Sequence, residues 1–474
     1  MDPDLRRSFY CMMLTAAVGL MVARIANVEV QFEPSVQKAN PARKWPAAPP
    51  DPWPTFGSND RARWATVKAL VEERTFVIGR RVPDPAAPKG YTDTGILFTD
   101  GFKSVDVVLH PDRQEFYATK PPLLTLLVAG EYWVMHNHRY TKWNLAEHRW
   151  EVVVTALLAT NVLPLAVAFL LLSRLLEAYG RTDWGRLFVF AVACFGTFLT
   201  TFSVTLNNHL PAACCVFYAL YAVVKPRPDG APISLGAGLV AGLFAGLAVC
   251  LDLPAASLVG ALAAVLLFRS PRTLLTYVPA AILPLAAQTY VSHAYTGEWA
   301  PIYAQFGGPW YEYEGSHWAK RHLIPKADGI DFADDPKPTY AFHFLFGHHG
   351  LFSLTPVWLL AVVGLFLPGN DGGTGRAVRR WTLAVLAVVV AFYIWKTNNY
   401  GGWTSGPRWL FWLTPLFLLG LLPTADALAG SRMGRAFALL LFAAGVFAAV
   451  YPWVNPWRHP WIYHWGEYMG WFKY

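Results

Sequence analysis

Two residues of opposite charge stand at the borders of the first long polar segment of the chain. Asp60 follows Ser58-Asn59 at the start of a helix predicted over residues 61–73, and Lys120 ends the segment just before two prolines. A helix N-terminus, with its free backbone N–H groups, keeps a carboxylate ionised. Such a carboxylate can take a proton, and an ammonium at an apolar boundary can bind a phosphate. The pair predicts chemistry on a lipid-borne anion at a membrane surface.

Both residues also have a plainer interpretation. Asp60 can be an ordinary helix cap, and Lys120 can be an interfacial lysine whose ammonium reaches back to water. Tyr117 lies three residues before Lys120 and shares its apolar boundary. Arg63 lies three residues after Asp60 and is a candidate to neutralise negative charge that develops on a substrate.

Later polar residues add weaker candidates. The turn Asn207-Asn208-His209 separates two apolar runs, and polar groups at membrane depth are costly unless they are partnered or line a wet cavity. Their plainer role is to satisfy the backbone of the turn. Adjacent histidines such as His348 and His349 seldom converge on one metal ion, so His349 is kept as a substrate-binding candidate. Arg408 has the planar fork that suits phosphate, and the competing explanation is a membrane anchor.

The composition predicts a membrane protein. Of 474 residues, 54% are hydrophobic and 15% are charged, and long apolar runs alternate with short basic loops. The pattern predicts an all-α polytopic protein with about eleven transmembrane helices and a large external first loop that carries juxtamembrane helices. The predicted spans are residues 9–23, 152–176, 187–206, 210–224, 235–251, 254–268, 274–291, 351–367, 381–395, 409–422 and 436–450.

Charge and cysteine usage exclude other classes. The formal net charge of +8 comes mostly from loops between spans, which is typical of a topology signal and not of nucleic-acid binding. All five cysteines fall within apolar runs, so they indicate neither a disulfide framework nor a metal cluster. No nucleotide-binding or hydrolase motif is present in the sequence.

The loop charges predict the orientation of the single domain, residues 1–474. The run 121–135 is too short to span comfortably, and we interpret it as a helix in the outer interface. The basic loops then share the cytoplasmic side with the N-terminus. The loops 24–120 and 293–350 lie outside, and the tryptophan-rich tail 451–474 lies at the outer interface.

Within the first loop, residues 41–54 are rich in proline and predict an extended lead-in. Residues 75–120 predict a small hairpin structure, whose aspartates we interpret as turn formers. The turns at residues 207–209 and 252 and the segment 396–408 also face outward, so a site is expected on the external face.

Two motifs resemble a known superfamily. The acidic helix start Asn59-Asp60-Arg61-Ala62-Arg63, followed by Tyr117-Ala118-Thr119-Lys120-Pro121-Pro122-Leu123, is similar to the first external loop of GT-C glycosyltransferases. These include protein O-mannosyltransferases, aminoarabinose transferases and bacterial mannosyltransferase-like proteins. Residues 347–356 and 401–410 are similar to later segments of such proteins. The chain departs from the pattern where many members carry a second acidic residue, because Asn207-Asn208-His209 stands in that place.

The resemblance implies a glycosyltransferase that moves a sugar from a polyprenyl-phosphate donor to a hydroxyl on a lipid, glycan or protein acceptor. Asp60 would be the catalytic base, or the ligand of a divalent cation if one is used; no cofactor is otherwise implied. Lys120 would lie near the donor phosphate. The expected location is the bacterial inner membrane, with the active face extracytoplasmic. The alternative is a transporter or flippase for an anionic lipid or a lipid-linked sugar, which should show inverted repeats.

Overall fold

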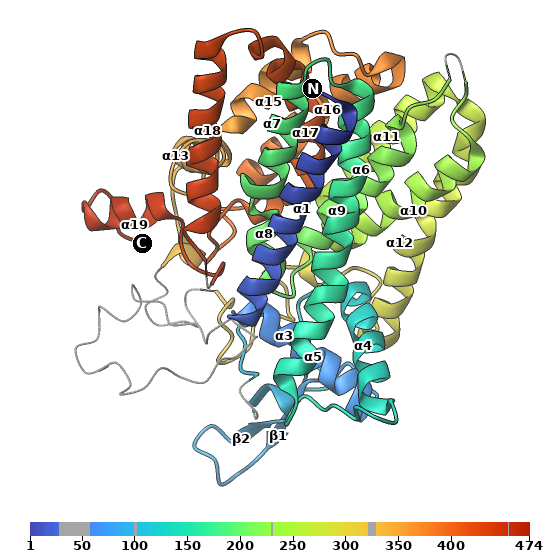
Figure 1. Cartoon of the computed structure of the whole chain (residues 1–474). Coiled ribbons are helices and arrows are strands. Elements are labelled where there is room, and N and C mark those ends of the chain that lie inside the picture. Colours follow the sequence, from blue (N-terminus) through green and yellow to red (C-terminus); the bar gives the residue numbers. More distant parts are fainter. Residues whose placement is uncertain (28–56, 99–101, 229–230, 321–328, 454) are drawn as a thin grey trace.

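The structure is a computed structural model that describes residues 1–27, 57–98, 102–228, 231–320, 329–453 and 455–474. Over these residues the chain forms a bundle of apolar helices with a small sheet at one end (Figure 1). Seven helical stretches are long and apolar enough to cross a membrane: Pro3–Ala26, Arg149–Tyr179, Asp183–Val204, Pro271–Thr296, Gly372–Lys396, Arg408–Leu428 and Arg432–Val450. Shorter apolar helices are His209–Val224, Leu235–Leu251, Leu253–Arg269 and Val357–Phe366. The predicted helical membrane class is confirmed, and the number of crossings stays a prediction.

Apart from the helix Lys337–Leu345, which lies in the predicted loop 293–350, the bundle is built from helices that overlap or adjoin the predicted apolar runs. In chain order they are α1 (Pro3–Ala26), α5 (Arg149–Leu157), η3 (Leu158–Val162), α6 (Leu163–Tyr179), α7 (Asp183–Phe195), α8 (Phe198–Thr201), η4 (Phe202–Val204), α9 (His209–Val224), α10 (Leu235–Leu251), η5 (Leu253–Ala255), α11 (Ala256–Arg269), η6 (Pro271–Thr273), α12 (Leu274–Thr296), α13 (Lys337–Leu345), α14 (Leu351–Leu354), α15 (Val357–Phe366), α16 (Gly372–Lys396), η10 (Arg408–Leu413), α17 (Thr414–Leu428) and α18 (Arg432–Val450).

Small residues bring some of these helices into close contact. A Cβ at Gly242 of α10 would lie 2.1 Å from the carbonyl oxygen of Tyr277 in α12, and a Cβ at Gly246 would lie 2.3 Å from that of Ala281. Only glycine therefore lets the two backbones approach so closely, as is common between membrane helices. The predicted run 351–367 is divided into α14 and α15, because Pro356 has no N–H with which to continue a helix.

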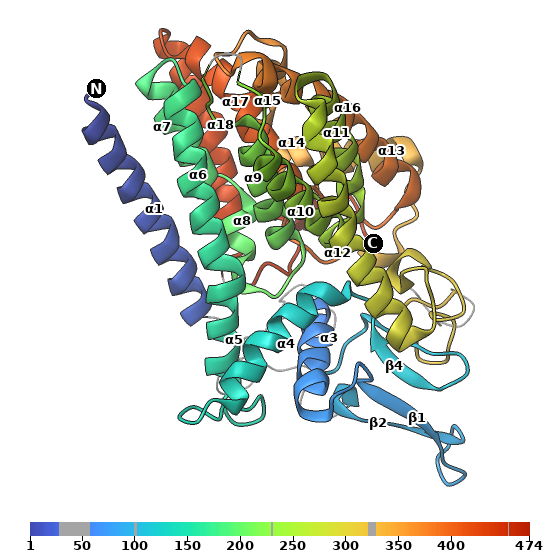
Figure 2. The ribbon, with the colours of Figure 1, turned by 90° about the vertical axis from the view of Figure 1, so that its right-hand side faces the viewer.

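The described part of the first loop forms a compact unit at the end of the bundle opposite the N-terminus (Figure 2). It contains α3 (Ser58–Lys68), η1 (Ala69–Glu73), β1 (Gly79–Pro83), β2 (Tyr91–Thr94), η2 (Ile96–Phe98), β3 (Val107–Leu109), β4 (Glu115–Ala118) and the following helix α4 (Pro122–Asn137). The strands form an antiparallel sheet in the order β2-β1-β4-β3. The predicted helix and hairpins are therefore present, and the lead-in 41–54 lies outside the described residues.

The second large loop and the tail pack against this end of the bundle. The loop contains η7 (Ile302–Ala304) and η9 (Ile330–Phe332), and the Trp318 indole donates to the Val105 carbonyl at 2.8 Å. The tail contains α19 (Trp461–Tyr468). Trp465 and Trp471 are exposed, as a belt residue would be, whereas Trp457 is 4% exposed and packs inside the protein.

Candidate active site

Four segments far apart in the sequence enclose two adjoining hollows of about 270 and 350 Å³. The segments are the first loop, the second large loop, the residues that precede α17 and the tail that follows α18. Both hollows are lined by Asp106, Trp318, Asp331, Asn399 and Arg408. The first also contains Ser58, Asn59, His317, Trp403 and Trp457, and the second contains Lys120, Tyr303, Phe306, Lys396 and Trp409. We call them the first and second hollows.

Strand register brings Lys120 to Asp106. Val107 of β3 pairs with Ala118 of β4, so the residues just outside each strand lie side by side. Thr119 donates its backbone N–H and its hydroxyl to the Asp106 carbonyl at 3.1 and 3.2 Å. The Lys120 ammonium then donates to Asp106 Oδ1 at 2.6 Å. The β3–β4 hairpin thus places an ion pair in the wall of the second hollow.

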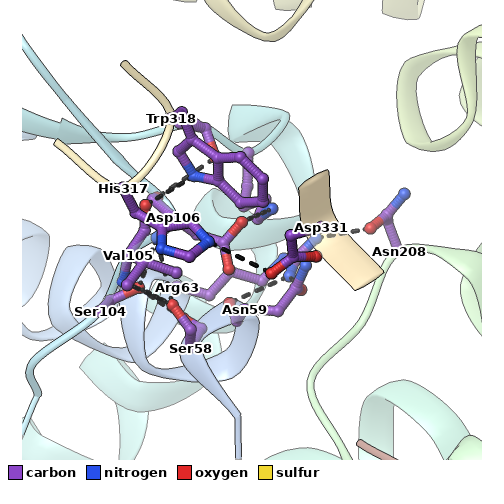
Figure 3. Close-up of polar contacts among 12 residues, drawn as sticks. Ser58, Asn59, Arg63, Ser104, Val105, Asp106, Asn208, His317, Trp318 and Asp331 are labelled. Carbon is purple, nitrogen blue, oxygen red and sulfur yellow. Dashed lines mark hydrogen bonds and ion pairs between the residues drawn. The ribbon is translucent and has the colours of Figure 1, made fainter. Parts of the chain in front are cut away.

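The surroundings of this ion pair keep the carboxylate ionised. Burial lowers the pKa of Lys120 to about 8, although the neighbouring Asp106 opposes this effect. Burial also opposes ionisation of Asp106, but the charges of Lys120 and Arg408 outweigh it and lower the pKa of the carboxyl. The backbone N–H of Asp106 is held by the hydroxyl oxygens of Ser58 and Ser104 at 3.1 and 3.0 Å (Figure 3).

Arg408 is positioned by a tight glycine turn. Its Nε and Nη2 donate to the Gly401 carbonyl at 3.0 and 2.7 Å, and its guanidinium lies 5.0 Å from the centre of the Trp457 ring. Gly401 and Gly402 have φ of +92° and +73°, a region that favours glycine. A Cβ at Gly402 would lie 2.6 Å from Asp331 Oδ1. The turn therefore aims Arg408 into both hollows and leaves room for the Asp331 carboxylate.

Asp60 is enclosed beside these hollows but lines neither of them. Its side chain is fully buried, and Oδ1 accepts a hydrogen bond of 2.8 Å from the Trp457 indole. Its Oδ2 is buried without a hydrogen-bond partner among the described residues. Burial raises the pKa of Asp60 to about 7, against the opposing charge of Arg63. Trp457 thus contacts Asp60 through its N–H and Arg408 through its ring.

Arg63, Asn208 and His209 join a buried polar network that links α3, α9 and α10. Arg63 donates to both oxygens of Asn59 and to Asn208 Oδ1, the latter at 2.5 Å. Asn208 donates to Asp252 Oδ1 at 3.1 Å, and His209 Nδ1 lies 3.0 Å from both Asp252 carboxylate oxygens. Arg63, Asn208 and His209 line neither hollow. The network fixes the start of α3 against the bundle.

Tyr117 and His349 lie apart from the hollows. The Tyr117 hydroxyl donates to Glu115 Oε2 at 2.6 Å, and its ring packs in a second apolar cluster with Trp310. His349 lies 2.5 Å from His348, Nδ1 to Nδ1, in a cluster of aromatic rings. Burial lowers the pKa of both histidines, that of His348 to about 2, so both are neutral. Their binding roles stay predictions.

Three polar residues that line the hollows were not among the predicted site residues. Asp106 was interpreted as a turn former, and His317 and Asp331 were not singled out within the second large loop. His317 Nε2 lies 3.2 Å from Asp331 Oδ2, with side chains 30% and 16% exposed (Figure 3). No spacing in the sequence marks these residues, because they come together only when the two loops pack.

Metal-ligand geometry is not present in the described parts of the chain. No group of three or more His, Cys, Asp or Glu side chains there is arranged to hold a metal ion. Asp60, the ligand considered from the sequence, offers one oxygen to Trp457, and Asp106 binds Lys120. The described residues therefore do not form a metal centre of this kind, and the use of a divalent cation stays a prediction.

No family model and no curated protein matches the chain. Similar solved structures include the oligosaccharyltransferase AglB from Archaeoglobus fulgidus, in complex with an inhibitory peptide and a dolichol-phosphate. It is 11% identical with a TM-score of 0.48, and the match covers 96% of this chain and 56% of AglB. ArnT from Cupriavidus metallidurans, bound to undecaprenyl phosphate, is 12% identical with a TM-score of 0.48, and the match covers 91% of this chain and 62% of ArnT.

This chain spans less than two thirds of the length of either, 56% of AglB and 62% of ArnT. At identities of 11% and 12%, these similarities do not establish the donor, the acceptor or the reaction.

Proposed function

We propose that this protein is a membrane glycosyltransferase that moves a sugar from a polyprenyl-phosphate donor to a hydroxyl acceptor on the extracytoplasmic face of the bacterial inner membrane. The observation that carries this proposal is the grouping of three cations, Lys120, Lys396 and Arg408, around the second hollow. Phe306 and Trp409 line the same hollow, and Phe306 is 64% exposed. A phosphorylated prenyl chain needs both features, cations for its head and apolar walls for its first isoprene units.

The hydrogen bonds of the three cations leave donors for a phosphate. Arg408 donates its Nε–H and one N–H of Nη2 to the Gly401 carbonyl. A guanidinium has five N–H groups, so these two bonds leave the other three for a ligand. Lys120 uses one of its three donors on Asp106. Lys396 is exposed at the end of α16. The hollow therefore offers charge-assisted hydrogen bonds to a phosphate from several directions.

Sugar transfer requires that donor and acceptor are aligned, that a proton is removed from the acceptor hydroxyl and that the charge on the departing phosphate is neutralised. A phosphate leaving group departs readily, so the protein must hold donor and acceptor together and stabilise negative charge on the departing phosphate. Lys120 and Arg408 are suited to the last task. Asp60 is fully buried and lines neither hollow, so it can serve as the predicted base only if an acceptor hydroxyl reaches its unbonded Oδ2.

A reconstituted assay tests the proposal. The full-length protein in liposomes is incubated with undecaprenyl-phosphate-linked mannose, glucose, galactose or arabinose, and release of undecaprenyl phosphate is measured. Water serves as a universal acceptor, so turnover does not depend on knowing the natural one. Lys120→Met and Arg408→Gln should each lower turnover and weaken binding of undecaprenyl phosphate. Lys103→Met is the matched control, because Lys103 is exposed and lines neither hollow.

Two results would contradict the proposal. The first is wild-type protein that binds undecaprenyl phosphate but releases none from any of the donors. The second is movement of the lipid-linked sugar between leaflets without cleavage, which would indicate a transporter.

A further inference from the structure

We infer that the His317–Asp331 pair is the proton acceptor that activates the acceptor hydroxyl. This inference rests on the proposed function and names a catalytic group that the sequence analysis did not. Asp331 lines both hollows and His317 lines the first, whereas Lys120 and Lys396 line the second. His317 therefore lies in the first hollow, away from the two lysines, whereas Asp331 and Arg408 line the wall that the two hollows share.

The two hollows differ in the groups that they offer. The second has the lysine ammonium groups and the apolar ring of Phe306, which suit the donor phosphate and its prenyl chain. The first has the hydrogen-bonding side chains of Ser58 and Asn59 and the indole of Trp403, which suit a polar, hydroxyl-bearing molecule. We place the acceptor in the first hollow and the sugar at the shared wall, beside Asp331.

The other two carboxylates near the wall are engaged. Asp106 binds the Lys120 ammonium at 2.6 Å, which stabilises its ionised form and weakens it as a base. Asp60 is enclosed and bonded to Trp457. Asp331 has no lysine or arginine salt bridge in the described part of the chain, and its nearest basic partner is the His317 ring. Asp331 is thus free to orient a histidine.

The hydrogen bond assigns the tautomer of His317. An ionised carboxylate only accepts hydrogen bonds, so Nε2 carries the proton that it donates to Asp331 Oδ2 at 3.2 Å. Nδ1 then carries the lone pair and can act as the base. The ring is held by Trp318, edge-on at 4.6 Å between centroids, and by Phe332 at 5.1 Å. A carboxylate that orients an imidazole and stabilises its charged form is a recurrent catalytic arrangement.

The step balances as a single displacement. The acceptor oxygen forms a bond to the anomeric carbon, while the bond from that carbon to the phosphate oxygen breaks. The bonding electrons leave with undecaprenyl phosphate, whose charge Lys120 and Arg408 neutralise. The hydroxyl proton moves to Nδ1 of His317, and the resulting imidazolium is stabilised by Asp331 until it releases the proton to water.

Donor hydrolysis by the full-length protein in liposomes tests this role. In the described residues, the other charged groups that line the first hollow are Asp106 and Arg408, so they also contribute to its pH dependence. His317→Gln keeps an N–H for Asp331 but loses the base. It should lower turnover of the best undecaprenyl-phosphate-linked sugar by about 10²–10⁴-fold. Binding of undecaprenyl phosphate should stay within about twofold, and the acid limb of the pH profile should disappear.

Chemical rescue separates a base from a structural residue. His317→Gly should regain turnover when imidazole is added, since free imidazole can enter the space left by the ring. His138→Gln is the matched control, because His138 is exposed and lines neither hollow.

If the wild type cleaves the donor and His317→Gln has the same pH profile as the wild type, the inference is overturned and the proposed function stands. Loss of turnover in His317→Gly that imidazole does not restore would have the same consequence. Wild-type protein that cleaves no donor would contradict the proposed function itself.

Discussion

Replacement of Asp60 by asparagine should change how the stability of this protein depends on pH. The Asp60 carboxyl is fully buried, with Oδ1 bonded to Trp457 and Oδ2 without a partner among the described residues. Burial raises its pKa from the ordinary value of 3.8 to about 7. Asparagine has nearly the same shape and can still accept the hydrogen bond from Trp457, but it cannot ionise. The substitution therefore isolates the effect of the charge.

The sign follows from the two pKa values. Because the folded-state pKa lies above the unfolded one, folding is favoured by the proton on Asp60. This contribution is fully present below about pH 4 and is lost as the pH rises through about 7. The gap between 3.8 and about 7 corresponds to about 4 kcal/mol, at 1.36 kcal/mol for each pKa unit. Asp60→Asn should therefore match the wild type near pH 4 and be more stable by up to about 4 kcal/mol near pH 8.

Thermal unfolding of the detergent-solubilised protein, followed by tryptophan fluorescence between pH 4 and pH 9, measures the difference. The gap between the melting temperatures of Asp60→Asn and the wild type should open between pH 4 and pH 7 and then stay constant. A difference in melting temperature that stays the same from pH 4 to pH 9 would refute the reasoning. It would show that Asp60 has an ordinary pKa in the folded protein.

Three further substitutions test the packing of the site. Trp457→Phe removes the indole donor to Asp60 and should cost about 1–3 kcal/mol, more above pH 7 than below it, as measured by the same melting curves. Gly402→Ala places a Cβ 2.6 Å from Asp331 Oδ1 at a φ of +73°, and should lower the stability by about 1–2 kcal/mol and reduce donor cleavage; unchanged cleavage would show that Asp331 has room to move. Asn208→Leu removes an acceptor from the buried Arg63 guanidinium and should cost about 2–3 kcal/mol in denaturant unfolding.

Much of the helical architecture was predictable because apolar runs are a local property. The predicted runs 210–224 and 235–251 correspond to α9 and α10 within one residue at each end. Residues 381–395 form only the second part of α16, which begins at Gly372. Its first turns carry Arg379, which is buried because it pairs with Asp371 at 2.7 Å. A hydropathy pattern does not recognise a charged helical turn that is buried through such pairing with the N-cap residue.

The site was predictable only in part. Lys120 and Arg408 could be proposed because each stands next to proline at a boundary between polar and apolar sequence, and the structure places both around one hollow. Asp106 could not be distinguished from other turn aspartates, because its contact with Lys120 depends on the register of β3 and β4. The role of Trp457 was also hidden, since tryptophans in the tail suggest a membrane interface.

The sequence by itself determined that this chain is a helical membrane protein with a large polar first loop, because hydropathy and proline positions act within a few residues. It also determined which charges stand at the borders of that loop. Only the tertiary structure decided which carboxylate faces the cations. Asp106 and Asp331 line the hollows, whereas Asp60 is buried and bonded to Trp457. The contact that buries Asp60 joins residues 397 positions apart, and the pairing of Asp106 with Lys120 depends on the register of two strands, so neither can be inferred from a local pattern.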